Sequence, residues 1–512
     1  MINITEMLEK TEKTNPDGIA YTDPESSVTY GELLEGSKKT ASFFLSEEII
    51  KPREKQNAVA FYMEKSCEAM QVIFGAVYAG ALYSFIDVRQ PADRALKVLS
   101  VLEPSVIITD QKNMDPLNEI LKDKLRIPVF EIKELISRVS SFSVKEELIE
   151  RVSVEHYDLK PLYVNFTSGS TGAPKGVAVS HRSVIDFISE FTEVFDINDK
   201  DIIANQAPFD FDVSVKDIYS GLYKGARVVL IPREYFSNPT VLMDYLGDNE
   251  VTTLIWAVSA MCFVSIMNGL EYRIPNKINK IMFSGELMPV KHLNKWKKFI
   301  PNALYVNLYG PTEITCNCTY HIIDREYENN EIIPVGIPFK NEKVFLLDED
   351  NNEIKETDTE GEICVGGTCL ALGYYKDEEK TALSFVQNPL NKCFYERIYR
   401  TGDIGKYDEE GRLIYTSRKD FQIKHMGQRI ELGEIEVAAM SEEEVSRACC
   451  LYDMKKKRIV LIYTGDMEKA VLNGNLHTKL PPYMIPGKTV KIDEFPLNKN
   501  GKIDRKALEE YL

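Results

Sequence analysis

The chain has 512 residues, 44% of them hydrophobic and 28% charged, which excludes a disordered, collagen-like or low-complexity protein. At roughly 150 residues per domain, this length allows about three domains, or one or two large ones. The formal net charge of −17 argues against general binding to nucleic-acid backbones or anionic membranes, so any phosphate must be bound by a local site.

Short β-rich apolar runs alternate with longer helical patterns through the first 335 residues. The expected strands lie at 57–62, 106–109, 162–166, 202–206, 226–231, 253–257, 280–284 and 304–307. The expected helices lie at 66–79, 182–194, 213–223, 259–268 and 289–298. This alternation predicts an α/β architecture with largely parallel sheets.

The pattern changes after about residue 335. Expected strands at 344–347, 361–365 and 412–416 are separated by turns rich in glycine, aspartate and asparagine. The last hundred residues contain expected helices at 431–440 and 466–479, strands at 448–452 and 458–463, and a terminal helix from residue 503. We predict a large N-terminal domain at 1–419, made of packed α/β sheets and a β-rich subdomain, and a small mobile α+β domain at 420–512.

Two uncharged stretches, 69–86 and 251–270, reach the length of a membrane span. Glycine and polar residues interrupt both, so we interpret each as a buried helix and strand side by side. The nine cysteines include no C-x-x-C pair, and the N-terminus lacks the basic-then-apolar order of a signal peptide. We expect a cytoplasmic chain without membrane insertion and, since the six histidines show no ligand spacing, without zinc.

The segment Thr-Ser-Gly-Ser-Thr-Gly-Ala-Pro-Lys-Gly at 167–176 directly follows an expected strand. Its glycines permit close backbone approach, and its hydroxyls and Lys175 can bind polyphosphate oxygens. It does not fit the P-loop pattern, because Gly176 follows Lys175 where serine or threonine is required. Taken alone, the composition of the segment leaves a flexible surface loop as the less favoured alternative.

Four further segments contain side chains that could bind parts of a nucleotide. Asn-Leu-Tyr-Gly-Pro-Thr-Glu at 307–313 offers an aromatic ring for a base and two oxygen ligands, and Tyr-Arg-Thr-Gly-Asp at 399–403 offers a carboxylate for ribose hydroxyls. A basic stretch at 417–427 leads into Arg-Ile-Glu-Leu-Gly-Glu-Ile-Glu at 429–436, and Asn-Gly-Lys-Ile-Asp-Arg lies at 500–505. Each could be an ordinary turn, but together they indicate a nucleotide site.

With these motifs the chain resembles the adenylate-forming superfamily, in its amino-acid-activating branch of peptide-synthetase adenylation domains. The similarity runs from Val-Thr-Tyr-Gly-Glu-Leu at 28–33 to Lys502. Within this branch the segments 205–215 and 421–424 resemble stand-alone D-alanine:D-alanyl carrier protein ligases. The resemblance implies ATP- and Mg²⁺-dependent activation of an amino acid as aminoacyl-AMP. Transfer to the phosphopantetheine thiol of a separate carrier protein would follow.

The resemblance also implies residue roles. The phosphate-binding residues would be Thr167, Ser168, Gly169, Ser170, Thr171, Gly172 and Lys175. Tyr309 would pack on adenine, Glu313 would bind Mg²⁺ with Thr312 beside it, and Asp403 and Arg418 would hold the ribose. Lys502 would reach the substrate carboxylate and the α-phosphate. Lys502, Glu313 and Thr167 would be catalytic, and Asp420 would be the hinge. Ser417 and Leu372 depart from the family's usual glycine and arginine.

Asp212 is the implied partner of the substrate α-ammonium. Two alternatives stay open: it could cap a helix starting at Val213, or pair with Lys216 one turn on. The implied side-chain pocket consists of Val213, Lys216, Trp256, Met282, Ser284, Leu308, Cys316 and Asn317. Trp256 would favour a small side chain unless it stacks on an aromatic one. Lys216 could accept a side-chain carboxylate, and Ser284, where the D-alanine ligases carry cysteine, weakens a D-alanine assignment.

Two other functions remain possible from the residues. An aryl- or acyl-CoA ligase is the first, which Asp212 and Pro311 disfavour. A nucleotide-binding regulator without catalysis is the second, against which the presence of Glu313 and Lys502 argues. Nothing resembling a carrier domain follows the terminal helix, so we expect the carrier protein to act in trans.

Overall fold

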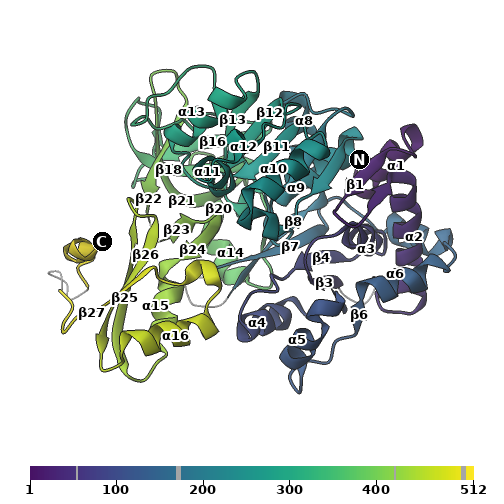
Figure 1. The fold of residues 1–512 in the computed structure, drawn as a ribbon, viewed down its shortest axis with the longest axis horizontal. Helices are drawn as coiled ribbons and strands as arrows, with labels where there is room; N and C mark the ends of the chain where they lie inside the picture. Colours follow the sequence, from purple (N-terminus) through teal and green to yellow (C-terminus); the bar gives the residue numbers. More distant parts are fainter. Residues whose placement is uncertain (53–55, 169–173, 420–421, 497–502) are drawn as a thin grey trace.

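The computed structural model describes residues 1–52, 56–168, 174–419, 422–496 and 503–512. Figure 1 shows two large sheets flanked by helices, an adjoining antiparallel sheet, and a smaller C-terminal unit at lower left. The predicted α/β class with a β-rich part is confirmed.

The largest sheet of the described residues has nine strands, and its middle strands pair in parallel. In spatial order they are β15 (Ile337–Pro338), β14 (Thr319–Ile322), β13 (Leu304–Tyr309), β12 (Lys280–Ser284), β11 (Thr253–Ala257), β9 (Ile202–Asn205), β10 (Arg227–Leu230), β1 (Ile19–Thr22) and β2 (Ser27–Thr29). Every residue of β11 is buried, because helices cover both faces of a parallel sheet.

The second sheet has seven strands in the described residues. Their order is β19 (Gly373–Tyr374), β8 (Lys175–Ser180), β7 (Pro161–Thr167), β4 (Leu82–Phe85), β3 (Ala58–Tyr62), β5 (Val106–Thr109) and β6 (Val129–Glu131). One hydrophobic core contains side chains from both sheets and from the helices between them, α2 (Tyr30–Ser46), α3 (Cys67–Tyr78), α8 (His181–Val194) and α9 (Ser214–Lys224). The two sheets therefore share one core and form one unit.

The remaining helices of this unit lie on its outer faces and between strands. They are α1 (Thr5–Thr14), α4 (Ala92–Leu102), α5 (Gln111–Leu121), α6 (Ile132–Ser140), α7 (Glu146–Val154), α10 (Pro239–Asp248), α11 (Val258–Ile266), α12 (Gly269–Tyr272), α13 (Val290–Phe299) and α14 (Glu378–Ser384). The uncharged stretches at 69–86 and 251–270 are helix–strand pairs, α3 with β4 and β11 with α11, as predicted.

A separate core lies beneath α10, α11 and α13. It contains both tryptophans of the chain, Trp256 and Trp296, whose rings are 6.5 Å apart and nearly perpendicular. Each indole nitrogen donates to a backbone oxygen, of Ala204 and Met261 respectively. Both rings are therefore fully buried with their polar atoms satisfied.

The third sheet is antiparallel and adjoins the large unit. Its strands are β17 (Glu353–Ile354), β16 (Glu342–Leu347), β18 (Gly361–Gly367), β21 (Arg397–Tyr407), β20 (Phe385–Gln387) and β22 (Leu413–Arg418). The C-terminal unit contains the hairpin β23 (Gln422–His425) and β24 (Gln428–Glu431), helices α15 (Leu432–Met440) and α16 (Lys469–Lys479), and the sheet of β25 (Val445–Asp453), β26 (Arg458–Gly465) and β27 (Lys488–Lys491).

The predicted terminal helix from residue 503 is wrong in extent and type. The chain forms only a short 3₁₀ helix, Ala507–Tyr511, which buries Leu508 against the C-terminal sheet. Asp504 accepts from the backbone N–H groups of Lys506 and Ala507, so its side chain begins a turn here. Such side-chain bonding competes with a regular helical start.

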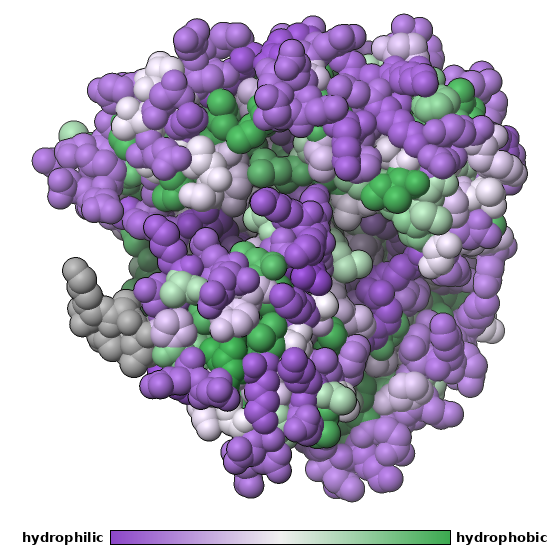
Figure 2. Space-filling view, turned by 60° about the vertical axis from the view of Figure 1, so that its left-hand side comes forward, coloured by the Kyte–Doolittle hydropathy of each residue, from purple (hydrophilic) through white to green (hydrophobic). Residues whose placement is uncertain are grey.

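No helix in the described residues is long and apolar enough to cross a bilayer. Figure 2 shows one face that is mostly hydrophilic, with hydrophobic residues visible in small separate areas. All nine cysteines are free thiols, and eight of them are buried.

The N-terminus is held by a buried histidine that must stay neutral. Ile4 N–H donates to His181 Nδ1 at 3.2 Å, and the His156 ring packs edge-on against His181. Burial, with the nearby His156, lowers the pKa of His181 well below its ordinary value. Protonation would remove the acceptor for Ile4 and place a charge in the core.

We therefore expect acid to destabilise the protein through His181. The folded state binds this proton less readily than the unfolded state. The free energy of unfolding should therefore decrease as the pH falls below about 6.5, the ordinary pKa of histidine, by up to about 1.4 kcal/mol per pH unit. Thermal unfolding midpoints of wild type and His181→Gln between pH 8 and 5 test this. The variant should lose less stability across that range; parallel curves would contradict the role.

Candidate active site

Several of the predicted site residues meet at the carboxyl ends of β7 and β13, where open α/β sheets bind ligands. Thr167 ends β7 and Lys175 begins β8, its antiparallel neighbour. Tyr309 ends β13, and Thr312 and Glu313 follow in a short 3₁₀ turn, Thr312–Ile314. Segments from two different sheets thus lie close together.

Glu313 is fully buried at the centre of a charged cluster. Its carboxylate accepts from Arg429 Nη1 at 2.5 Å and from the Tyr374 hydroxyl at 2.7 Å, and Lys175 Nζ lies 3.8 Å away. Burial alone would raise the pKa of Glu313, but the charges of Arg429 and Lys175 lower it to about 2. Glu313 is therefore ionised at neutral pH.

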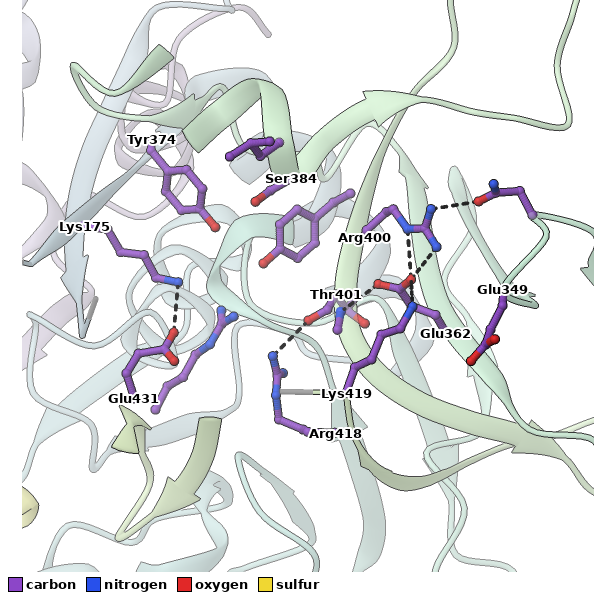
Figure 3. Close-up of a pocket in the computed structure, with 15 residues that line it drawn as sticks. Lys175, Glu349, Glu362, Tyr374, Ser384, Arg400, Thr401, Arg418, Lys419 and Glu431 are labelled. Carbon is purple, nitrogen blue, oxygen red and sulfur yellow. Dashed lines mark hydrogen bonds and ion pairs between the residues drawn. The ribbon is translucent and has the colours of Figure 1, made fainter. Parts of the chain in front are cut away.

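Lys175 lies between two carboxylates. Its Nζ is 3.6 Å from Glu431 and also near Glu313, and Figure 3 shows it pointing toward Glu431 beside a polar cavity of about 470 Å³. Burial lowers the pKa of Lys175 in spite of these carboxylates. Because Lys175 already lines this cavity, a phosphate group bound there would contact it without movement of another helix or strand.

Thr167 and Ser168 differ in their hydrogen bonding. Thr167 Oγ1 is buried and has no hydrogen-bond partner in the described part of the chain, so it can serve a ligand. Ser168 Oγ donates to the Arg429 backbone oxygen and accepts from the Glu431 N–H. The next loop residues, Gly169, Ser170, Thr171 and Gly172, lie outside the described residues.

A second cavity, of about 570 Å³, fits a nucleoside. Tyr309 and Arg418 line it, and Asp403 accepts from the Tyr309 hydroxyl and from Arg418 Nη1. Lys424 Nζ lies 5.2 Å from the centre of the Tyr309 ring. The buried Tyr309 ring thus lines the cavity with the Lys424 ammonium over it and the Asp403 carboxylate next to it.

Asp212 lines a small cavity together with Thr167, Ser168 and Thr312. Helix α9 starts at Ser214 and has no side-chain cap, so Asp212 does not cap it. No ion pair within 4.0 Å joins Asp212 to Lys216 or to any other described cation. Burial raises the pKa of Asp212, and a hydrogen bond from Thr312 partly offsets this.

The structure brings most of the proposed side-chain pocket together beside Asp212. Lys216 Nζ donates to Asn317 Oδ1 at 2.6 Å and to Ser284 Oγ at 3.3 Å, and Cys316 Sγ contacts the Asp212 backbone oxygen. Met282, Leu308 and Cys316 belong to the same core, and Val213 is buried next to Asp212.

Trp256 does not lie with the other residues of the proposed side-chain pocket. Its ring packs in the core beneath α10 and α11, whereas Ile255 before it faces the core that contains Met282. Side chains alternate along a strand, so Ala257 shares the face of Ile255. The structure therefore places Ala257, and not Trp256, on the pocket side of β11.

The hairpin β23–β24 contributes residues for which the sequence motifs gave no role. Arg429 and Glu431 reach the Glu313 cluster, Lys424 reaches Tyr309, and Gly427 N–H donates to Glu286 at 2.6 Å. A buried ion pair between Arg94 and Glu434 also joins the large unit to α15. The sequence signals were the basic stretch at 417–427 and the charged motif at 429–436.

Lys502 and Asp420 lie outside the described residues. On either side of 497–502, Asp504 N–H donates to the Pro496 oxygen, and Ile503 packs against the C-terminal sheet. In Figure 1 the C-terminus lies at the outer left edge, away from β7 and β8.

Glu313 is the carboxylate near the phosphate-binding residues that would hold Mg²⁺. Among the described residues no three His, Cys, Asp or Glu side chains form a metal site. Mg²⁺ is usually held by one or two carboxylates together with substrate phosphates, but here Tyr374 and Arg429 engage both Glu313 oxygens, so Mg²⁺ would have to take the place of Arg429.

Comparison with known proteins identifies relatives of the whole chain. The model of the AMP-binding enzyme family matches residues 8–375. Zwittermicin A synthase ZmaJ of Bacillus cereus is 32% identical, over 99% of this chain and 94% of its own length. The L-proline--[L-prolyl-carrier protein] ligase of Streptomyces coelicolor is 30% identical, over 94% and 91%. Bacitracin synthase 1 of Bacillus licheniformis is 32% identical over 99% of this chain, which spans only 9% of it.

Solved structures share the fold. The Vibrio cholerae adenylation domain AlmE, in complex with glycyl-adenosine-5′-phosphate, superimposes with a TM-score of 0.84 at 21% identity, covering 100% of this chain and 98% of AlmE. An NRPS protein containing adenylation and PCP domains superimposes with a TM-score of 0.82 at 24% identity, covering 100% and 84%.

Proposed function

The chain belongs to the family of AMP-binding enzymes, and from this membership we propose that it activates an amino acid with ATP and transfers it to a carrier protein. The first product is an aminoacyl adenylate with release of pyrophosphate. The second is a thioester on the phosphopantetheine arm of a carrier protein that acts in trans. The prolyl-carrier protein ligase among the relatives supports this second step. The free cysteines support a cytoplasmic location.

One observation carries the proposal. The buried Asp212 carboxylate lines the same small cavity as Thr167 and Thr312, and no described cation pairs with it. A carboxylate in such a place lacks a partner that an α-ammonium would supply. The cavity would thus hold the amino group of the substrate next to the phosphate-binding residues.

The first reaction needs positive charge rather than a general base. A substrate carboxylate is ionised at neutral pH, and its attack on the α-phosphorus brings two anions together. Bound Mg²⁺ would supply charge at the phosphates, held by Glu313. Lys175 contributes a second cation beside the Thr167 hydroxyl, and Lys502 is proposed to bring a third to the α-phosphate.

The second reaction requires a different arrangement of the C-terminal unit. In this structure Arg429 of the hairpin β23–β24 contacts Glu313. The residues flanking 497–502 pack on the C-terminal sheet of β25, β26 and β27. We assign this arrangement to thioester formation, and propose that rotation about Asp420 brings Lys502 to the site for adenylation. The Arg94–Glu434 ion pair stabilises the present arrangement.

An amino-acid panel tests the function. ATP–pyrophosphate exchange should occur with one or a few of the proteinogenic amino acids, assayed as both enantiomers, and not with aryl acids. The activated amino acid should then label a phosphopantetheinylated carrier protein. CoA-dependent AMP release with acids that lack an amino group would instead support an acyl- or aryl-CoA ligase. Nucleotide binding without exchange for any acid would support a regulator.

A further inference from the structure

Lys216 is a buried cation that has no role in the two reaction steps proposed above. It lies on α9, four residues after Asp212, and is 1% exposed. Its ammonium donates to Asn317 Oδ1 and Ser284 Oγ, both of which are neutral. No carboxylate of the described residues lies within 4.0 Å of it.

Asp217 and Asp212 attract the Lys216 ammonium, but neither forms an ion pair with it within 4.0 Å. Asp217 points to the Asn205 amide, which donates to it at 2.7 Å. Asp212 faces the small cavity that it shares with Thr167 and Thr312. Cys316 is also adjacent, but burial raises the pKa of its thiol well above the ordinary value, so it carries no charge.

A buried ammonium has three N–H donors, and here only two have acceptors that the structure defines. Burying such a charge without a contacting anion is costly, and burial lowers the pKa of Lys216, although the charges of Asp217 and Asp212 partly offset this. A ligand anion would satisfy the third donor and neutralise the charge. The pocket residues Met282 and Leu308 are apolar and cannot do so.

We infer that Lys216 binds the side-chain carboxylate of the substrate, so that aspartate or glutamate is the amino acid activated. This inference rests on the proposed function, because it requires the α-ammonium to bind Asp212. Asp212 lies in the turn before α9, and Lys216 lies in the first turn of that helix. Cys316 contacts the Asp212 backbone oxygen, and the next residue, Asn317, accepts from Lys216, so the two charged residues share one neighbouring segment. This placement suits a short amino acid with opposite charges at its α-amino group and side-chain end.

Pyrophosphate exchange with matched pairs of substrates tests the inference. Aspartate or glutamate should be activated with a kcat/KM at least tenfold above that of its amide, asparagine or glutamine, and above that of alanine and glycine. Each pair has nearly the same shape, so the ratio measures recognition of the charge. Both enantiomers belong in the panel.

Lys216→Met keeps most of the side-chain volume and removes the charge. It should lower kcat/KM for the acidic substrate at least tenfold and leave the amide no worse, which reverses the preference. Lys224→Met, at the end of the same helix, is the matched control and should keep the wild-type ratio. If Lys216→Met does not fold, Asn317→Asp gives a second test, since its internal carboxylate should compete with the substrate and lower acid activation at least tenfold.

The outcomes separate the two proposals. A wild-type preference of tenfold or more for a neutral amino acid would overturn the role of Lys216 and leave amino-acid activation intact. An acid preference that persists in Lys216→Met and Asn317→Asp would also overturn it. Absence of exchange with every amino acid would instead overturn the proposed function itself.

Discussion

Replacing Lys502 by alanine should lower amino-acid-dependent pyrophosphate exchange by two to three orders of magnitude. The transition state joins two anions and gathers charge on the α-phosphorus, and removing one placed donor of this kind costs about 3–4 kcal/mol of barrier. The thermal unfolding midpoint should hardly change, because a charged lysine in a glycine- and asparagine-containing motif is not expected to contribute to a hydrophobic core.

Two controls sharpen this test. Lys506→Ala removes an exposed lysine from the same terminal segment and should retain wild-type exchange. Transfer of the aminoacyl group from a supplied aminoacyl adenylate to the carrier should survive in Lys502→Ala, because that step is proposed to use the other arrangement. More than a tenth of wild-type exchange in Lys502→Ala would refute its role.

Asp212→Asn should lower kcat/KM for the amino acid at least 100-fold. The asparagine keeps the size of the side chain and can still hydrogen-bond to Thr312, but it no longer compensates the buried α-ammonium. Breaking a buried charge pair costs about 3–5 kcal/mol. Pyrophosphate exchange at varied amino acid concentration measures the loss.

The same variant should also discriminate less against the substrate analogue that lacks the amino group. In the wild type that analogue leaves Asp212 buried without its partner, whereas the neutral amide of the variant would not penalise it. Asp199→Asn, an exposed change just before β9, is the control and should leave both values unaltered. Equal discrimination in wild type and Asp212→Asn would exclude an ammonium at this position.

The fold was predictable where the pattern of apolar residues determines it. Regular alternation of short β-rich runs and helices predicted the parallel strands β9 to β13, because such strands are buried on both faces. For the same reason it could not predict which face of β11 lines the pocket. Trp256 and Ala257 are both apolar neighbours in a fully buried strand, and only the packing of α10 and α11 decides which way each one points.

The candidate site was predictable only in part, for a related reason. Thr167, Lys175, Tyr309 and Glu313 come from motifs at strand ends, and the packing of the two sheets brings them together. Arg429 reaches Glu313 from 116 residues away, on a charged hairpin whose pattern is typical of a solvated turn. Contacts of this kind depend on how the C-terminal unit sits on the large one, which local sequence does not encode.

The position of the two tryptophans determines what intrinsic fluorescence can report. Trp256 and Trp296 lie in one core of the large unit, and residues 420–512 contain no tryptophan. Indole emission during denaturation therefore follows the large unit alone, while far-UV circular dichroism follows both units. Where the two signals diverge, the C-terminal unit unfolds separately, and a tryptophan introduced into it would give its proposed rotation an optical signal of its own.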